Sequence, residues 1–249
     1  QTFPHIPLHV GEAFRGKTKA GIYADVLAEL DWSVGEVLAA LKKHGLEDDT
    51  LVIFSSDNGP WLTFGNHGGT AGPLREGKGT CFEGGVRVPC VARWPGKIPA
   101  GAVQSEPAMT IDVFPTLAKL IGADLPKHAI DGKDVWPLFA ATEGAKSPQE
   151  AYFFYYGTGE LQAMRSGKWK LQFPHTARST AGQEPGKDGK AGKSVPLKVG
   201  LELYDLSADI GETKDVSAAH TDVMKQLLGY ADAARTDLGD SLTKSVGTG

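Results

Sequence analysis

The sequence has few cysteines, no long apolar run and no excess of positive charge. Its two cysteines, Cys81 and Cys90, are too few for a disulfide framework or a cysteine-based zinc site, and they could pair or stay free. No apolar stretch reaches the roughly 18 residues that a membrane-spanning helix needs, so we expect no membrane span. With 26 Lys and Arg against 30 Asp and Glu, the formal charge is -4, which excludes a strongly basic nucleic-acid binder.

The composition is that of a folded chain of 249 residues, long enough for one large domain or one and a half. Hydrophobic residues make up 41% and charged residues 22%, which favours a buried core over disorder. The chain opens on Gln1 with no basic or apolar leader, so we expect any targeting segment to be absent or already removed. Its 32 glycines and 15 prolines concentrate in residues 59–101, which indicates a long loop held in a defined shape.

Apolar spacing predicts an α/β arrangement in the first part of the chain. Residues 22–41 carry apolar side chains at intervals of three and four, which predicts a helix ending before Gly45. Residues 50–55 form a nearly continuous apolar run, typical of a strand covered on both faces in a parallel sheet. We also expect a strand at residues 88–94, a short helix at 111–121 and an irregular surface covering at 124–148.

The second part of the chain is predicted to form a small antiparallel subdomain. Short strands are expected at residues 151–156, 161–165, 169–173 and 201–204, and a closing helix at 216–238. Residues 174–194 hold no large apolar side chain and many Gly, Lys, Ser and Thr, which predicts a mobile loop. We therefore divide the chain into an α/β part, residues 1–149, and an antiparallel part, residues 150–249.

Asp57 and Asn58 directly follow the strand predicted at residues 50–55. Open α/β sheets place their ligand sites at the carboxyl ends of strands, and beyond a strand end two adjacent side chains can aim at one point. A carboxylate beside an amide carbonyl is a pair of hard oxygens that suits Ca²⁺ or Mg²⁺ better than zinc. The alternative is an Asp-Asn-Gly-Pro turn that binds nothing.

Lys78 lies in a glycine-rich segment that comes close to a phosphate-binding P-loop. Position 79 is Gly, however, so the metal-binding hydroxyl is missing, and no strand leads into the segment. These departures exclude nucleotide binding. The interpretation that remains is a lysine on a glycine-rich backbone that can approach an anion closely. The alternative is an ordinary solvated lysine in a loop.

Histidines form a weaker signal. His5 and His9 are four residues apart, but Pro4 and Pro7 forbid the regular helix on which they could share a zinc ion. One of them could still donate a hydrogen bond to an anion. His67 lies in the glycine-rich stretch as a candidate for the rim of the same site, or as an ordinary exposed loop residue.

Cys90 begins the sequence Cys-Val-Ala-Arg inside the strand predicted at residues 88–94. A cysteine in a buried strand is most simply a small core residue. We therefore do not count Cys90 among the reactive groups.

Three sequence blocks together resemble the type I sulfatases, the arylsulfatase family. The blocks are Pro4-His5-Ile-Pro-Leu, Phe54-Ser-Ser-Asp57-Asn58-Gly59 and Gly77-Lys78-Gly-Thr-Cys-Phe-Glu83-Gly-Gly-Val-Arg87-Val-Pro, in the family's order. The resemblance implies an alkaline-phosphatase-like fold, in which a mixed sheet is flanked by helices and followed by the small antiparallel subdomain. It also implies that Asp57 and Asn58 are Ca²⁺ ligands, with Mg²⁺ as a possible substitute.

The same resemblance implies that Lys78 and His5 are catalytic residues that bind the sulfate group, with Lys78 near the leaving-group oxygen and His5 assisting its departure. His67 has no firm counterpart and is kept as a possible substrate contact. The expected reaction is hydrolysis of a sulfated carbohydrate or aryl sulfate. A phosphodiesterase or phosphonate hydrolase of the same superfamily, and a non-catalytic binder of sulfated glycans, are the alternatives.

One departure from the family is large. Its members carry a Cys-x-Pro/Ala-x-Arg motif whose cysteine becomes formylglycine, and two further aspartates complete the metal site. Neither feature occurs here, and Cys90-Val-Ala-Arg93 is one residue too short. The chain thus resembles the C-terminal portion of a sulfatase, with the missing N-terminal half and a sulfated small molecule or glycan as partners. Family resemblance also implies a periplasmic or secreted location.

Overall fold

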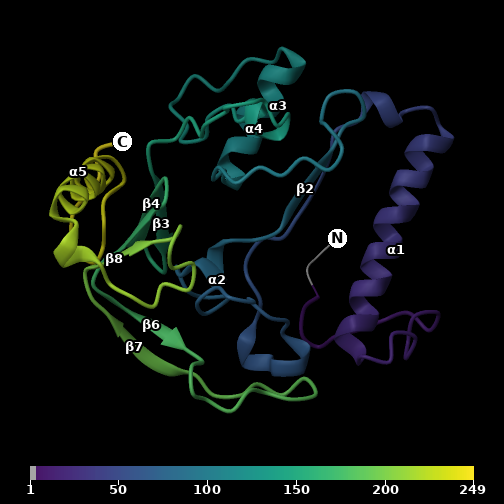
Figure 1. Cartoon of the computed structure of the whole chain (residues 1–249), viewed down its shortest axis with the longest axis horizontal. Helices are drawn as coiled ribbons and strands as arrows, with labels where there is room; N and C mark the ends of the chain where they lie inside the picture. Colours follow the sequence, from purple (N-terminus) through teal and green to yellow (C-terminus); the bar gives the residue numbers. More distant parts are fainter. Residues whose placement is uncertain (1–3) are drawn as a thin grey trace.

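A computed structural model describes residues 4–249 of the chain. The expectation about a targeting segment depends on Gln1, which lies outside the described residues. Figure 1 shows helix α1 on one side of the molecule, helix α5 on the opposite side and the strands between them. The helices are α1 (Ile22–Lys43), α2 (Glu83–Val86), α3 (Val113–Ile121), α4 (Trp136–Phe139) and α5 (Thr221–Leu238). The strands are β1 (Val52–Ser55), β2 (Cys90–Arg93), β3 (Tyr152–Tyr156), β4 (Glu160–Ser166), β5 (Trp169–Gln172), β6 (His175–Ser179), β7 (Val195–Val199) and β8 (Glu202–Asp205). Short 3-10 turns are η1 (Glu47–Asp49), η2 (Leu62–His67), η3 (Thr110–Asp112) and η4 (Ser217–Ala219).

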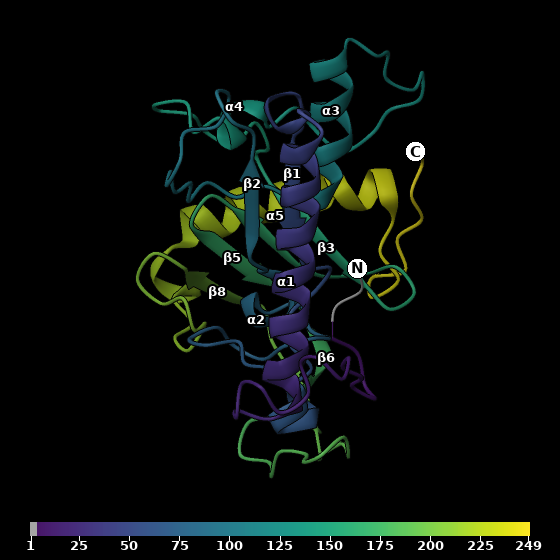
Figure 2. The same cartoon turned by 90° about the vertical axis from the view of Figure 1, so that its right-hand side faces the viewer.

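Helix α1 confirms the helix expected from the apolar spacing, and Figure 2 shows it standing in front of β1 and β2. Its first turn is fixed by Asp25, whose carboxylate accepts hydrogen bonds from the backbone N–H groups of Gly16 (2.7 Å) and Thr18 (3.0 Å). Asp25 is the one buried residue of the helix, while Leu27 and Val37 are exposed. The apolar side of α1 therefore does not form a closed core within the described residues. No helix among them is long and apolar enough to cross a bilayer.

Strand β1 occurs where the apolar run predicts a strand, but its neighbour runs in the other direction. It pairs antiparallel with β2, Val52 opposite Arg93 and Ser55 opposite Cys90, and Phe54 remains 39% exposed. The expectation of a parallel strand covered on both faces is wrong, because an apolar run reports hydrophobicity and not the direction of neighbours. The expectation of a buried Cys90 is also wrong. Cys90 is exposed, because β1 and β2 form a sheet of only two strands and no other described element covers it there.

The antiparallel strands expected in the second part of the chain form a four-stranded sheet in the order β3-β4-β5-β8, with every neighbouring pair antiparallel. Helix α5 packs on one face of this sheet and starts at Thr221, five residues later than predicted for the closing helix, because residues 217–219 form the turn η4. The buried side chains of sheet and helix form one core: Leu161, Met164, Leu171, Phe173, Leu203, Leu227 and Ala231. This core holds the second half of the chain together.

Two segments predicted to be irregular contain regular structure. The expectation that residues 174–194 form only a loop is wrong. The segment begins with β6, which pairs antiparallel with β7. Alternate β6 residues His175, Ala177 and Ser179 are buried, so the strand keeps a period of two without large apolar side chains. In the segment 124–148, helix α4 forms and Leu138 is buried, so this segment is more than a surface covering.

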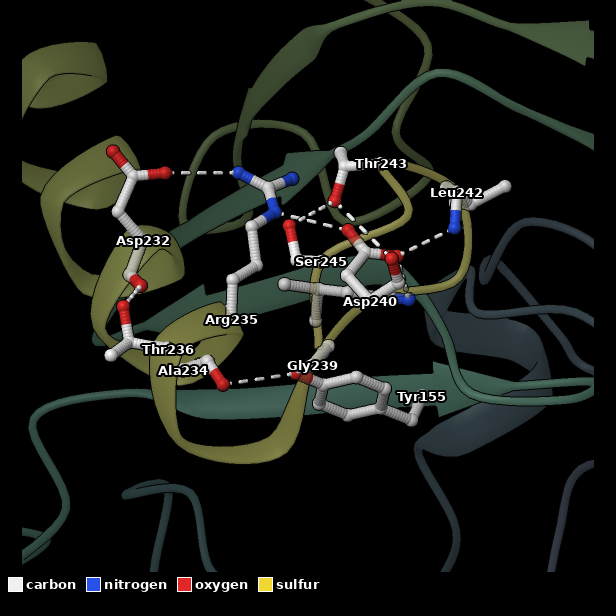
Figure 3. Close-up of polar contacts among 11 residues, drawn as sticks. Tyr155, Asp232, Ala234, Arg235, Thr236, Gly239, Asp240, Leu242, Thr243 and Ser245 are labelled. Carbon is white, nitrogen blue, oxygen red and sulfur yellow. Dashed lines mark hydrogen bonds and ion pairs between the residues drawn. The ribbon is translucent and has the colours of Figure 1, made fainter. Parts of the chain in front are cut away.

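The C-terminal segment is tied back to the sheet by polar contacts around Asp240 (Figure 3). The Asp240 carboxylate accepts hydrogen bonds from Arg235 Nε at 3.0 Å and from the backbone N–H of Leu242 at 3.0 Å. The hydroxyl of Tyr155 on β3 donates to the carbonyl of Gly239 at 2.9 Å. Gly239, with φ of 82°, ends α5 in a conformation that favours glycine.

A buried ion network fastens α2 to the four-stranded sheet. Lys170 on β5 and Arg165 on β4 reach the two carboxylate oxygens of Glu83 at 2.9 and 3.0 Å. Glu212 accepts a hydrogen bond from the Glu83 backbone N–H at 2.6 Å.

Burial opposes ionisation of Glu83, but Lys170 and Arg165 outweigh it and hold the pKa of Glu83 below its usual value. Burial raises the pKa of Glu212. The network joins residues far apart in the sequence at one buried carboxylate.

Replacing Lys170 by Met should lower the free energy of unfolding by up to about 3 to 5 kcal/mol, because it removes the fully buried one of the two counter-ions of Glu83 and leaves only Arg165 to pair with that carboxylate. Lys168→Met is the matched control, since the Lys168–Asp205 pair lies at the surface and should contribute less than about 1 kcal/mol. Urea unfolding of both variants measures the difference. Equal losses for the two lysines would contradict the assignment.

Glu83→Gln should also change the pH dependence of stability. Because the pKa of Glu83 is lowered by folding, its stabilising contribution is present above the unfolded-state pKa and is lost as the pH falls through the folded-state pKa. The difference in unfolding free energy between wild type and Glu83→Gln should therefore shrink as the pH drops from 7 into the acidic range. Urea unfolding at a series of pH values measures it, and a difference that grows on acidification would show the opposite linkage.

Candidate functional site

Four of the five predicted site residues line one cavity. His5, Asp57, Asn58 and Lys78 face a cavity of about 940 Å³ that lies between α1 and the loops that follow β1. Its apolar wall includes Tyr23, Leu27 and Leu30 of α1 together with Phe54, Leu74 and Val88. Chain segments distant in sequence thus bring a carboxylate, an amide, an ammonium and an imidazole to the same space.

The loop that carries Asp57 and Asn58 is held by backbone contacts with α2. The N–H of Gly59 donates to the carbonyl of Gly85 at 2.9 Å, and a Cβ on Gly59 would lie only 1.8 Å from the carbonyl oxygen of Gly84. Ser56 Oγ donates to the carbonyl of Asn58 at 3.0 Å. Only glycine allows this approach, so the turn after β1 has a fixed shape.

Asn58 carries the buried polar atom that bears most directly on a metal site. Its side-chain oxygen Oδ1 is buried and accepts no hydrogen bond from any described residue, which is costly for a polar atom. The neighbouring Asp57 is exposed to the cavity. An amide oxygen and a carboxylate fit a hard cation such as Ca²⁺. Within residues 4–249, however, no group of three or more His, Cys, Asp and Glu could hold a metal ion. The pair can supply only part of the roughly six to eight oxygens that Ca²⁺ takes.

Lys78 is positioned by the two glycines that flank it. Its backbone N–H donates to the carbonyl of Pro60 at 2.9 Å, and a Cβ on Gly77 would lie 2.4 Å from the same oxygen. Gly79 has a φ of 91°, which favours glycine. No carboxylate in the described part of the chain forms an ion pair with Lys78, so its charge is available to an anion.

The orientation of His5 follows from one hydrogen bond. Its Nδ1 lies 2.9 Å from the carbonyl oxygen of Ile6, and since a carbonyl only accepts, Nδ1 must carry the hydrogen. The other ring nitrogen, Nε2, is then the atom that remains to contact a molecule in the cavity.

His67 is not brought to the cavity. It ends the turn η2, and its Nδ1 is buried with no hydrogen-bond partner among residues 4–249. A Cβ on Gly189 would lie 3.6 Å from that atom. It thus faces the connection between β6 and β7, which also exchanges hydrogen bonds between Asn66 and Asp188. A role for His67 in substrate contact stays a prediction that this geometry does not favour.

Trp61 is a site residue that the sequence reasoning missed. The Lys78 ammonium lies 4.9 Å from the centroid of its ring, and the His5 ring lies 5.2 Å away. The available signal was an aromatic residue directly after the Asp57-Asn58-Gly59-Pro60 turn.

Solved structures with a similar fold include sulfatases. A sulfatase from a Pseudoalteromonas species superimposes with a TM-score of 0.82 at 28% identity, covering 98% of this chain and 48% of the other. A phosphonate monoester hydrolase of Agrobacterium radiobacter also matches, with a TM-score of 0.51 at 26% identity over 85% of this chain. The fold is therefore the alkaline-phosphatase-like fold of sulfatases, with small antiparallel sheets in its C-terminal part.

Sequence comparison gives the family. Residues 4–123 match the sulfatase family model, and residues 147–246 match the model of the C-terminal region of aryl-sulfatase. Arylsulfatase A of Bos taurus is 40% identical over 230 residues, and arylsulfatase A of Homo sapiens is 40% identical over 233 residues. The chain belongs to the type I sulfatase family and is similar to arylsulfatases. Each match includes 90% of this chain. The chain spans less than half of each relative, 44% of the bovine protein and 45% of the human one.

Gly59→Ala should separate the loop after β1 from α2, because the new Cβ would overlap the Gly84 carbonyl oxygen. We expect a loss of at least ~2 kcal/mol in unfolding free energy. The control is Gly35→Ala in the exposed middle of α1, where nothing lies within 4 Å, and which should stabilise by up to about 1 kcal/mol. Chemical denaturation measures both, and a neutral Gly59→Ala variant would show that the close approach is not needed.

Proposed function

We propose that this chain supplies the sulfate-binding part of a sulfatase active site, in which a sulfate ester is hydrolysed to an alcohol and inorganic sulfate. The observation that carries the proposal is the shared cavity of His5, Asp57, Asn58 and Lys78, in which Asn58 Oδ1 is buried without a partner. A site for a tetrahedral anion needs positive groups that converge from several sides. Lys78 and His5 supply two such groups, and a cation held by Asp57 and Asn58 would supply the third.

Each residue has a role that its contacts support. Asp57 and Asn58 would hold Ca²⁺, or Mg²⁺, through their side-chain oxygens. When bound, the cation would stabilise negative charge on the sulfate oxygens by about a few kcal/mol. Lys78 pairs with a sulfate oxygen and lies near the bridging oxygen. His5 donates a proton from Nε2 to the bridging oxygen as the sulfur–oxygen bond breaks.

The nucleophile in this proposal comes from a segment outside these residues, as formylglycine does in the family. The cysteines of the chain are poor candidates for that role. Burial raises the pKa of the Cys81 thiol to about 11, and partial desolvation by its neighbours raises the pKa of the more exposed Cys90. A thiol with a raised pKa is a weak nucleophile at neutral pH. The N-terminal half of the enzyme is thus the partner that the proposal requires.

The substrate proposed is a sulfated carbohydrate or an aryl sulfate, and the location proposed is periplasmic or secreted. Names of relatives support the class of substrate: arylsulfatase A, steryl-sulfatase of Mus musculus at 38% identity, and N-acetylgalactosamine-6-sulfatase of Canis lupus familiaris at 34%. A phosphonate or phosphate ester is the second candidate, supported by the similarity to the phosphonate monoester hydrolase. Binding of a sulfated glycan without turnover is the outcome expected if no nucleophile joins the site.

Lys78→Ala should lower the turnover of 4-nitrophenyl sulfate by about 10²- to 10³-fold, because a cation that faces the developing charge is lost. The assay uses the enzyme that contains this chain together with the segment carrying the nucleophile. Lys225→Ala on the exposed face of α5 is the control and should leave turnover unchanged.

The same assay with 4-nitrophenyl phosphate separates the two reactions. Faster turnover of the sulfate than of the phosphate supports a sulfatase, and the reverse supports the second candidate. Near-normal turnover in Lys78→Ala would contradict both assignments of this cavity.

A further inference from the structure

Trp61 contacts both groups that the proposed function assigns to the departing end of the substrate. The Nζ atom of Lys78 lies over the indole, 4.9 Å from its centroid. The imidazole of His5 lies 5.2 Å from the same ring at an angle of 56°. One side chain thus joins two residues that come from separate loops.

The indole of Trp61 is itself held in place. The ring of Phe64 meets it edge to face, with centroids 4.6 Å apart and an angle of 71°. The backbone N–H of Trp61 donates to the carbonyl of Gly68 at 3.0 Å, and the preceding Pro60 accepts the hydrogen bond from the Lys78 backbone. Main chain and ring are therefore both fixed relative to the Lys78 loop.

An aromatic ring can position a lysine without neutralising it. The lysine side chain has a flexible four-carbon stem, so its ammonium has many positions when nothing restrains it. A carboxylate would restrain it but would also pair with its charge. The face of an indole attracts the cation and carries no net charge, which leaves Lys78 free to bind an anion.

We propose that Trp61 is a positioning residue that holds the Lys78 ammonium and the His5 imidazole at one indole ring, so that both meet the same anion. This inference rests on the proposed function and names a further residue on which the site depends. Trp61 does not line the cavity, so it acts through its two neighbours and not by touching the substrate.

Trp61→Leu in the complete enzyme should lower kcat by roughly threefold to thirtyfold with little change in KM, because a cation–π contact that orients the reacting group is lost. Trp61→Phe keeps an aromatic face and should restore most of the loss. In a Lys78→Ala background, Trp61→Leu should have a much smaller effect than in the wild type, since Trp61 acts largely through Lys78.

A second readout does not depend on turnover. In NMR spectra of the complete enzyme with isotope-labelled lysine, the ring current of the indole should shift the Lys78 ε-methylene protons upfield. The shift should disappear in Trp61→Leu and persist in part in Trp61→Phe. An unchanged Lys78 signal in Trp61→Leu would overturn the proposed contact.

The chain offers a matched control. Trp169 also lies between a lysine and a histidine, with Lys168 Nζ at 4.6 Å and the His220 ring at 4.8 Å, but it belongs to β5 and not to the cavity. Trp169→Phe should leave kcat unchanged. An equal loss of kcat in Trp61→Leu and Trp61→Phe, or full additivity with Lys78→Ala, would show that Trp61 acts only on folding and would overturn the inference.

Failure of the inference can be told apart from failure of the proposed function. An enzyme that hydrolyses the phosphate ester but not the sulfate ester would contradict the sulfatase assignment. The Trp61 and Lys78 variants would then be compared on the phosphate ester, and the same non-additivity would support the positioning role. If the losses of kcat from Trp61→Leu and Lys78→Ala were additive on the ester that the enzyme hydrolyses, the positioning role would be overturned.

Discussion

The site depends on a close approach of three stretches of backbone that only glycine permits. Gly59 lies against the Gly84 carbonyl and Gly77 lies against the Pro60 carbonyl, in both cases nearer than a Cβ would allow. The first contact fixes the turn that carries Asp57 and Asn58, and the second fixes the loop that carries Lys78. Because carbonyl oxygens cannot move aside like flexible side chains, the two loops have one arrangement, and the cavity follows from it.

The buried ion network extends this arrangement to the rest of the molecule. Helix α2 stands between the two loops, and its first residue, Glu83, is held by Lys170 and Arg165 from the four-stranded sheet. An unpaired charge at Glu83 would be far more costly than an unpaired charge at the surface, so the pairing ties the loops to the sheet and its core. The C-terminal subdomain thus acts as a support for the site, although it adds no residue to the cavity wall.

The sequence predicted the elements whose signals are local. Helix α1 followed from the three-and-four spacing, and the convergence of Asp57, Asn58 and Lys78 followed from their place in the blocks shared with sulfatases. The direction of the neighbour of β1 was not predictable, because pairing is set by residues elsewhere in the chain. Strand β6 was missed because its inward residues are small or polar. The approach of Trp61 to Lys78 was missed because a lone aromatic after a turn has no local signature, and His67 was placed by proximity in sequence alone.

In the proposed function, a hard cation at Asp57 and Asn58 and the ammonium of Lys78 bind the same tetrahedral anion. A crystal structure of the complete enzyme grown with Ca²⁺ and inorganic sulfate, with the cation located by anomalous scattering, tests it most directly. We predict a cation within about 2.3 to 2.6 Å of Asn58 Oδ1 and of an Asp57 oxygen, with a sulfate oxygen within hydrogen-bonding distance of Lys78 Nζ. A cation bound elsewhere, with Asn58 Oδ1 still lacking a partner and sulfate away from Lys78, would contradict the account.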